Sequence, residues 1–348
     1  MKINDIIIDE YMPIVQAMKV LDNTSKKILF IADDGILKAT MTDGDIRRWI
    51  LSNGSLDAKA KDLANYSPKY IFENNKAEIK KIFLNKGVEA IPVVDCQKKI
   101  ISIVFRDDEI IKNNAELNIP VVIMAGGLGT RLYPYTKILP KPLIPIGEIP
   151  IAEHIINRFK AFNCNDFYLI VNHKKNMIKA YFNEIEKDYN ITYIDEEKPL
   201  GTGGGLSLLK GEISSTFILS NCDILIDDDY YKIYEHHKRE GNIITMVCSL
   251  KNITIPYGVV EVNESGNIHN MREKPDLSFL TNTGMYIVEE RVIEELEQDA
   301  PISFPEIIEK YRNNSEKVGI YPISENSWLD MGQLDEMENM RKKLEMEK

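Results

Sequence analysis

The chain has 348 residues, of which 44% are hydrophobic and 28% charged, an ordinary composition for a globular protein. Its length exceeds the usual size of a single domain, so we expect two. The formal charge of −11 argues against a broad basic face for nucleic acid, and bound anions must meet local cations or a metal.

Cysteine spacing and hydropathy indicate the compartment. The four cysteines are far apart and form no CxxC pair, so neither a disulfide framework nor a zinc site is indicated. No apolar run approaches the roughly 20 residues needed to span a bilayer. We therefore expect a soluble, cytoplasmic protein that binds neither membrane nor nucleic acid.

Two similar passages occur in the first third of the chain. They are KILFIADDGILKATMTDGDIRRWI from Lys27 and EAIPVVDCQKKIISIVFRDDEII from Glu89. Each is typical of a strand, an acidic turn, a second strand and a helix that begins at an aspartate. Asp43 in the first copy matches Asp107 in the second, 64 residues further on. Such a repeat predicts two supersecondary units that pack together.

The repeat resembles a tandem pair of CBS domains over residues 1–116, a small α/β domain. In such pairs, threonines and an aspartate around the end of the second strand bind adenine nucleotides. The residues so implied are Thr40, Thr42, Asp43 and Asp107. The second copy has Val104 and Arg106 at the threonine positions, which implies one well-formed site and one altered site. The alternative is a pair that only dimerises the protein, and we expect a homo-oligomer.

A polar stretch, IKNNAELNIP at 111–120, has turn residues and marks a domain boundary, with a second domain over 119–348. Beyond it, apolar strand patterns alternate with amphipathic helix patterns. The strands are expected at 121–125, 166–172, 191–195 and 217–225, and the helices at 151–162 and 176–185. This alternation predicts an α/β fold with an open, mostly parallel sheet, whose ligands bind at the carboxyl ends of the strands.

A glycine-rich turn, GGLGTR at 126–131, directly follows the first strand of this sheet. Glycines at such a turn let backbone N–H groups approach phosphate oxygens closely. A G-x-G-x-x-G dinucleotide site is excluded because Leu132 stands at the third glycine position, and a P-loop because no G-K-[ST] follows. Arg131 and Lys141, the latter between two prolines, favour a phosphate site over a purely structural turn.

The longer stretch GGLGTRLYPYTKILPKPL resembles the signature of the sugar-1-phosphate nucleotidyltransferases, GGxGTRLxPxTxxxPKP. Later segments follow in the family's order: EEKPLGTGGGL, SNCDIL, YGVVE, REKP, NTGMY and WLDMGQ. The resemblance covers residues 120–340 and implies a Rossmann-like nucleotidyltransferase fold. It implies that Arg131 and Lys141 are catalytic and that Asp223 and Asp330 hold Mg²⁺. Cys222 is expected to be a small buried filler, because a soft thiolate does not suit Mg²⁺.

The resemblance also assigns substrate contacts. The nucleotide contacts it implies are Gly126, Gly127, Gly129, Thr130, Glu197, Gly201 and Thr202. The sugar-phosphate contacts it implies are Tyr257, Gly258, Glu273, Lys274, Asn282 and Thr283. Guanine presents two N–H donors along one edge, which match a carboxylate, so Glu197 favours GTP over uracil or thymine nucleotides. Glu196 is the alternative acid.

The reaction implied by the resemblance is transfer of a nucleoside monophosphate from an NTP to a sugar 1-phosphate, with release of pyrophosphate. CBS pairs ahead of such a domain resemble the glucosamine-1-phosphate guanylyltransferases that serve legionaminic acid synthesis for surface or flagellar glycans. GTP and glucosamine 1-phosphate are therefore the expected substrates. The alternatives are mannose 1-phosphate, a heptose 1-phosphate, and a catalytically silent regulator that senses nucleotides.

Overall fold

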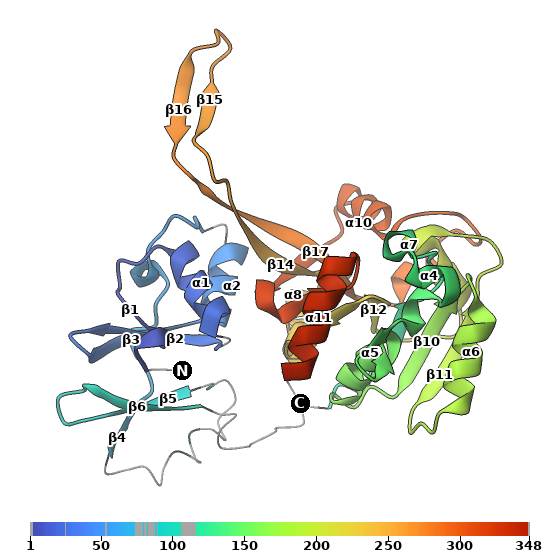
Figure 1. Cartoon of the computed structure of the whole chain (residues 1–348), viewed down its shortest axis with the longest axis horizontal. Helices are drawn as coiled ribbons and strands as arrows, with labels where there is room; N and C mark the ends of the chain where they lie inside the picture. The colour runs from blue at the N-terminus through green and yellow to red at the C-terminus, as the bar shows by residue number, and fades with distance from the viewer. Residues whose placement is uncertain are drawn as a thin grey trace. The chain divides into compact units, whose positions relative to one another are not determined.

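The structure is a computed structural model that describes residues 3–24, 26–52, 54–73, 79, 82, 88, 90–105 and 116–346. The chain divides into two compact units (Figure 1). The first comprises Met1–Asn113, Leu250–Leu280 and Ser324–Asn326, and the second comprises Asn114–Ser249, Thr281–Ile323 and Ser327–Lys348. Asp107 and Arg106 lie outside the described residues.

The first unit contains two three-stranded sheets with the same topology. Their strands are β1 (Ile7–Ile8), β2 (Ile28–Asp33) and β3 (Ile36–Thr42), then β4 (Ile71–Phe72), β5 (Ala90–Val94) and β6 (Ile100–Phe105). In each sheet the first pair is parallel and the second antiparallel. A register shift interrupts the second pair in both, at Ile31/Ala32 and at Val93/Val94. Strand order, direction and bulge therefore repeat, as expected of a duplicated unit.

The two repeats are joined through their turns. The backbone N–H of Leu37 donates to the carbonyl of Lys98 over 3.0 Å, and that of Ile100 donates to the carbonyl of Gly35 over 2.9 Å. Side chains from both sheets share one hydrophobic cluster, to which α1 (Ile14–Thr24) also contributes. Each sheet thus buries apolar surface that it could not cover alone.

Helix α2 (Asp43–Leu51) begins at the predicted aspartate. Thr42 caps it, with its hydroxyl accepting from the N–H of Asp45 while the Asp45 carboxylate accepts from the N–H of Thr42 over 2.7 Å. This is a capping box, a common signal for the start of a helix. Asp43 forms an ion pair with Arg47 at 2.7 Å, and the backbone of Thr40 pairs with Asn65. Nucleotide binding by these residues stays a prediction.

An extended hairpin completes the first unit. The distal parts of β14 (Ile244–Thr254) and β17 (Asp276–Val288) lead into β15 (Val259–Val262) and β16 (Ile268–Arg272), which pair with each other (Figure 1). Lys19 of α1 forms an ion pair with Asp276 at 2.6 Å. Helix α1 and the stem of the hairpin are thereby tied together.

The second unit is built on a seven-stranded sheet in the order β11-β10-β7-β12-β17-β14-β18. The remaining strands are β7 (Val121–Met124), β10 (Asp166–Val171), β11 (Asn190–Asp195), β12 (Phe217–Asn221) and β18 (Val318–Ser324). Four neighbours, β11, β10, β7 and β12, are parallel, whereas β17 runs antiparallel to β12. The predicted α/β fold with a mostly parallel central sheet is confirmed.

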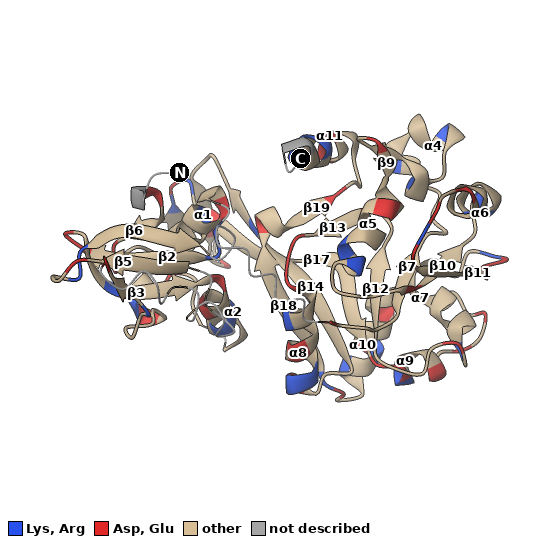
Figure 2. Cartoon of the chain, turned by 90° about the horizontal axis from the view of Figure 1, so that it is seen from below, with Lys and Arg blue, Asp and Glu red and all other residues tan. Residues whose placement is uncertain are grey.

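Helices cover both faces of this sheet. Successive side chains of β7 alternate between two hydrophobic clusters, with Val121 and Ile123 in one and Val122 in the other. The first cluster takes in α5 (Ile151–Lys160), α6 (Lys175–Glu184), α8 (Tyr230–Glu240) and α11 (Leu334–Met346), and the second takes in α10 (Phe304–Asn313). Figure 2 shows α5 and α11 on one side of the sheet and α10 on the other. None of the helices in the described ranges is long and apolar enough to cross a bilayer.

The strand predicted over 217–225 is divided in two. The strand β12 ends at Asn221, and a separate strand, β13 (Ile224–Ile226), pairs antiparallel with β19 (Trp328–Asp330) outside the central sheet. Cys222 and Asp223 form the break between them. Asp223 therefore lies at the carboxyl end of β12, where ligands of parallel sheets bind.

Candidate active site

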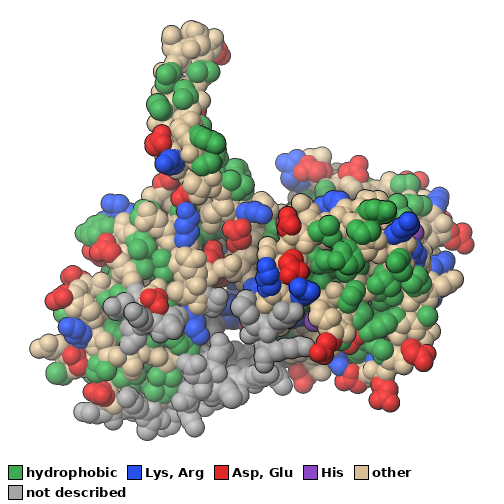
Figure 3. Space-filling view, viewed as in Figure 1, with side chains coloured by type: hydrophobic (Ala, Val, Ile, Leu, Met, Phe, Trp, Pro, Cys, Tyr) green, Lys and Arg blue, Asp and Glu red, His purple; other side chains and the backbone are tan. Residues whose placement is uncertain are grey.

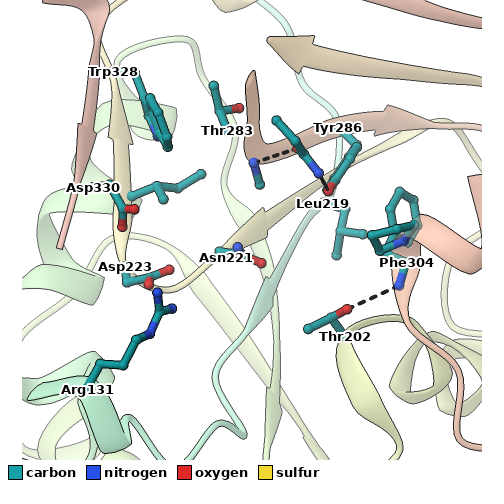
Figure 4. Close-up of a pocket in the computed structure, with 14 residues that line it drawn as sticks. Arg131, Thr202, Leu219, Asn221, Asp223, Thr283, Tyr286, Phe304, Trp328 and Asp330 are labelled. Carbon is teal, nitrogen blue, oxygen red and sulfur yellow. Dashed lines mark hydrogen bonds between the residues drawn. The ribbon is translucent and has the colours of Figure 1, made fainter. Parts of the chain in front are cut away.

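A cavity of about 260 Å³ lies in the second unit beside the carboxyl end of β12 (Figure 4). Its lining combines polar side chains with aromatic ones, among them Tyr286, Phe304 and Trp328. The structure brings six of the predicted site residues to this cavity: Arg131, Thr202, Asp223, Asn282, Thr283 and Asp330. In Figure 4, Arg131 extends toward Asp223.

Asp223 and Asp330 come together because β13 and β19 pair. Ile224 lies opposite Asp330 in the register, and the N–H of Met331 donates to the carbonyl of Asp223 over 2.8 Å. Asp223 is buried. Burial, followed by the negative charge of Asp223, raises the pKa of Asp330 to about 6. Two acids thus face one cavity. Of these, Asp330 is mostly ionised only above about pH 6.

Lys141 partly neutralises this pair. Its ammonium forms an ion pair with the Asp223 carboxylate, and both side chains are largely buried, with 12% and 10% of their surfaces exposed. The short helix η6 (Lys141–Leu143) begins just after Pro140, and a proline follows Lys141 as well, so the backbone on both sides of the lysine is restricted. The ion pair ties the signature segment to the end of β12.

The donor set fits Mg²⁺. Carboxylate oxygens are the hard ligands that Mg²⁺ takes, and it is usually held by one or two carboxylates plus phosphates and water. Within the described ranges, no group of three or more His, Cys, Asp or Glu side chains could hold a metal by itself. An acid whose pKa is raised by burial and by a neighbouring carboxylate, as for Asp330, matches a cation held jointly with substrate. Cys222 is buried in the hydrophobic cluster as predicted, and burial raises the pKa of its thiol to about 12.

The glycine turn connects β7 to η5 (Thr130–Leu132). Its glycines differ in their surroundings. Gly129 has φ +66°, and a Cβ there would lie 2.8 Å from Cγ2 of Thr136 and 3.2 Å from Cβ of Lys141. A Cβ on Gly127 would meet no atom within 4 Å. Gly129 is therefore required by backbone and packing, whereas the space above Gly127 is open, and nucleotide binding by these glycines stays a prediction.

Lys174, which the sequence analysis did not single out, holds the far end of the same segment. Its ammonium donates to the carbonyls of Thr136 and Lys137, each over 2.8 Å, and to that of Ile138 over 3.1 Å. These carbonyls belong to α4 (Tyr135–Ile138), whose last turn has no intrahelical partners for them. A polar NHKK run directly after β10 was the available signal, since it stands at the carboxyl edge of the sheet.

Asn172 and His173, which precede Lys174, hold the backbone of Glu196 and the start of the glycine turn. The N–H of His173 donates to the carbonyl of Gly126 over 3.5 Å, and the amide of Asn172 donates to the carbonyl of Glu196 over 2.7 Å. The Glu196 side chain is buried, accepts from the N–H of Leu200 over 3.1 Å, and has its pKa raised by burial. Glu197 is exposed. Of the two acids, Glu196 is the one next to the glycine turn, because a Cβ on Gly126 would lie 3.0 Å from its Oε2.

The GTGGG run packs closely against the segment before α10. Gly201 has φ +80°, and a Cβ there would lie 2.8 Å from the carbonyl oxygen of Ile302. The Thr202 hydroxyl accepts from the N–H of Phe304 over 3.1 Å (Figure 4). Both residues thus have a structural role, and their contact with nucleotide stays a prediction, as does that of Thr130.

The predicted sugar-phosphate residues fall into two groups. Thr283 donates to the carbonyl of Val247 over 2.8 Å, and Asn282 donates to the Tyr286 hydroxyl over 2.6 Å, so both are fixed at the cavity wall. The other four lie in the hairpin segment of the first unit: Tyr257, Gly258, Glu273 and Lys274. Their role stays a prediction.

Replacing Asp330 by Asn should stabilise the fold in Mg²⁺-free buffer. The folded-state pKa lies above the ordinary value of 3.8, so the stability linked to Asp330 is present below pH 4 and is lost as the pH rises through about 6. Allowing for solvent screening of a half-exposed group, we expect the variant to gain on the order of 1 kcal/mol at pH 7.5. Thermal unfolding from pH 4 to 8 should show the gain growing to pH 6 and then levelling; a gain independent of pH would contradict this account.

Alanine substitutions at Gly129 and Gly127 should distinguish a glycine needed for packing from one that borders open space. Gly129→Ala should destabilise the protein by about 1–2 kcal/mol or more, because φ is positive and Thr136 is too close. Gly127→Ala is the matched control and should leave Tm unchanged. Its effect is expected in nucleotide affinity, measured by calorimetry with each NTP. Equal losses of Tm in the two variants would show that the difference in packing is wrong.

Comparisons with known proteins place the second unit in a family. Residues 120–347 match the model of the family described as Nucleotidyl transferase. Mannose-1-phosphate guanyltransferase of Emericella nidulans is 33% identical over 227 residues, which cover 61% of this chain and 60% of that protein. The bifunctional protein GlmU of Methanococcus vannielii is 34% identical over 222 residues, covering 61% and 51%. The chain thus spans between half and three fifths of the length of these curated relatives.

A solved structure agrees on the fold. HddC from Yersinia pseudotuberculosis, complexed with GMP-PN, aligns with a TM-score of 0.50 and 22% identity over 65% of this chain and 99% of that one. At this identity the likeness shows the α/β fold alone. The family match covers more than half of the chain and confirms the resemblance drawn from the GGxGTRL signature. The chain belongs to the nucleotidyl transferase family.

Proposed function

We propose that this protein transfers a nucleoside monophosphate from an NTP to a sugar 1-phosphate and releases pyrophosphate. The observation that carries the proposal is the charge arrangement at one cavity, where Asp223 and Asp330 lie together and Lys141 is paired with the first of them. Arg131 adds a second cation. Both substrates are anions that repel each other, so a site that binds them side by side needs this combination.

The chemistry asks little of the protein beyond binding and orientation. An oxygen of the sugar 1-phosphate would attack the α-phosphorus of the NTP, with pyrophosphate leaving from the opposite side. The nucleophile is already an anion, so no general base is needed. Arg131 and Lys141 would orient the phosphates and stabilise their charge, and Asp223 and Asp330 would hold Mg²⁺. When bound, the metal supplies neutralisation of charge between the two substrates.

We propose GTP as the nucleotide. A carboxylate matches the two N–H donors on the edge of guanine, and Glu196 is the acid buried beside the glycine turn. We therefore assign base recognition to Glu196 in preference to Glu197, which is exposed. The name of the relative from Emericella nidulans, a guanyltransferase, supports the same base.

For the sugar we propose glucosamine 1-phosphate, with a role in precursor synthesis for legionaminic acid. This rests on the resemblance of the whole arrangement to guanylyltransferases preceded by CBS pairs. Mannose 1-phosphate is the second candidate, favoured by the name of the same relative. Glu273 would contact the sugar hydroxyls and Lys274 the sugar phosphate, and the first unit would bind an adenine nucleotide. A silent regulator is disfavoured because Arg131, Lys141 and both acids are retained.

An assay of pyrophosphate release tests both the substrates and whether the protein is an active nucleotidyltransferase. With Mg²⁺, GTP and glucosamine 1-phosphate should give the highest rate in a panel of NTPs and sugar 1-phosphates that includes mannose 1-phosphate. Lys141→Ala should lower kcat at least a hundredfold, because it removes a cation from the developing charge. The matched control is Lys137→Ala, a lysine of the same segment whose side chain is exposed, which should keep normal turnover. No release with any pair would favour the silent regulator.

Lys174 is a positioning residue in this scheme. In Lys174→Met, the three carbonyls of α4 lose their donor and the segment bearing Arg131 and Lys141 loosens, so we expect kcat to fall about tenfold with a smaller change in KM. Lys174→Arg should restore most of the rate. The control, Lys175→Met, removes a lysine that pairs with Asp195 at 3.3 Å and should leave kcat normal. A loss of Tm without a loss of kcat would mean that Lys174 serves stability alone.

A further inference from the structure

Exposed apolar side chains concentrate in the hairpin segment. Of the nineteen exposed large hydrophobic residues among those described, eight lie between residues 253 and 280. In Figure 3, hydrophobic side chains follow the hairpin along its length. Single exposed apolar residues are ordinary on protein surfaces, but a contiguous group of this kind marks an interaction site.

The register of the hairpin sorts its side chains into two faces. Val260 lies opposite Met271 and Val262 opposite Ile268, and cross-strand partners share a face. These four residues, the hairpin face, are 46%, 62%, 63% and 68% exposed in the order Val260, Met271, Val262, Ile268. The other face takes the alternate pairs and holds an ion pair between Glu261 and Arg272 at 2.7 Å. The hairpin is therefore amphipathic, with a wholly uncharged apolar side.

Within the described part of the first unit, nothing covers the hairpin face. The strands β15 and β16 pair only with each other there, and none of the four side chains joins a hydrophobic cluster. A two-stranded hairpin is at best marginally stable in water, and an apolar face stabilises it only when packed against something. The sequences VVEV and IHNMR do not alternate strictly, and a register shift between Glu261 and Val262 is what places Ile268 opposite Val262.

We propose that the hairpin face binds the same face of a second copy of this chain, around a two-fold axis. An isologous interface requires a patch that complements itself, and an uncharged apolar face does so. Each chain has a net charge of −11, so two copies meet at lowest electrostatic cost where neither presents a charge. Glu261 and Arg272 lie on the opposite face, and none of the four residues of the hairpin face is charged, so a charged partner would find no match here. The proposal is independent of the reaction proposed above.

The test uses two variants of the full-length chain, each with two added glutamates on one face of the hairpin. Val260→Glu with Val262→Glu charges the hairpin face, and Val259→Glu with Asn270→Glu adds the same charge to the opposite face. In sedimentation velocity at micromolar concentration, the first variant should show half the mass of the wild-type chain and the second the wild-type mass. A monomeric wild-type chain, or equal masses for both variants, would overturn the proposal.

Cross-linking provides a readout that adds no charge. In a Cys96→Ser background, Ile268→Cys should give covalent dimers with a bismaleimide, and Asn270→Cys, on the other face, should give few. Hydrogen exchange in β15 and β16 should slow as the wild-type concentration rises, because association covers them. Protection that is strong and independent of concentration would mean that the face packs within one chain, contrary to the proposal.

Discussion

The ion pair between Lys141 and Asp223 is the interaction on which the rest of the candidate site depends. It joins a lysine set between two prolines to an acid at the break between β12 and β13, 82 residues further along the chain. A buried ion pair is not explained by stability, since desolvation of the two charges offsets most of their attraction. Here the pair compensates one of two neighbouring acids and leaves Asp330, whose pKa is raised by burial and by Asp223, without an equal partner. The excess negative charge is what a divalent cation would meet.

The glycine turn is held on several sides before any ligand arrives. Gly129 packs against Thr136 and Lys141, the Thr136 hydroxyl donates to the carbonyl of Gly129 over 3.0 Å, and Lys174 fixes the end of α4. Space is open above Gly127, whereas Gly129 is set by packing and by its positive φ. In the reaction proposed above, Lys141 would need little rearrangement on binding, because Asp223 already holds it.

The fold and the charged residues of the site could be predicted from the sequence, because both require particular residue types at particular positions. A strand buried on both faces, such as β7, is apolar throughout, and the signature names Arg131 and Lys141 directly. The break at Cys222 and Asp223 was missed because apolar residues, FIL before it and ILI after it, fit a strand on either side. Glu196 and Glu197 are neighbours of the same type, and only burial tells them apart. Lys174 binds backbone carbonyls, which every residue possesses, so no partner residue could reveal it. The apolar face of β15 and β16 depends on a register shift between Glu261 and Val262, so the sequences of the two strands do not reveal it.

Within the first unit, helix α1 contacts two segments that come from much later in the chain. Asn326 donates to the carbonyl of Asp22 in α1 over 2.5 Å, and Lys19 of the same helix pairs with Asp276. Both contacts lie within the first unit, to which Leu250–Leu280 and Ser324–Asn326 belong. The N-terminal repeat is therefore joined, within one compact unit, to segments that come much later in the chain. Contacts between such distant segments close long loops, so forming them costs more chain entropy than forming the contacts inside the repeat.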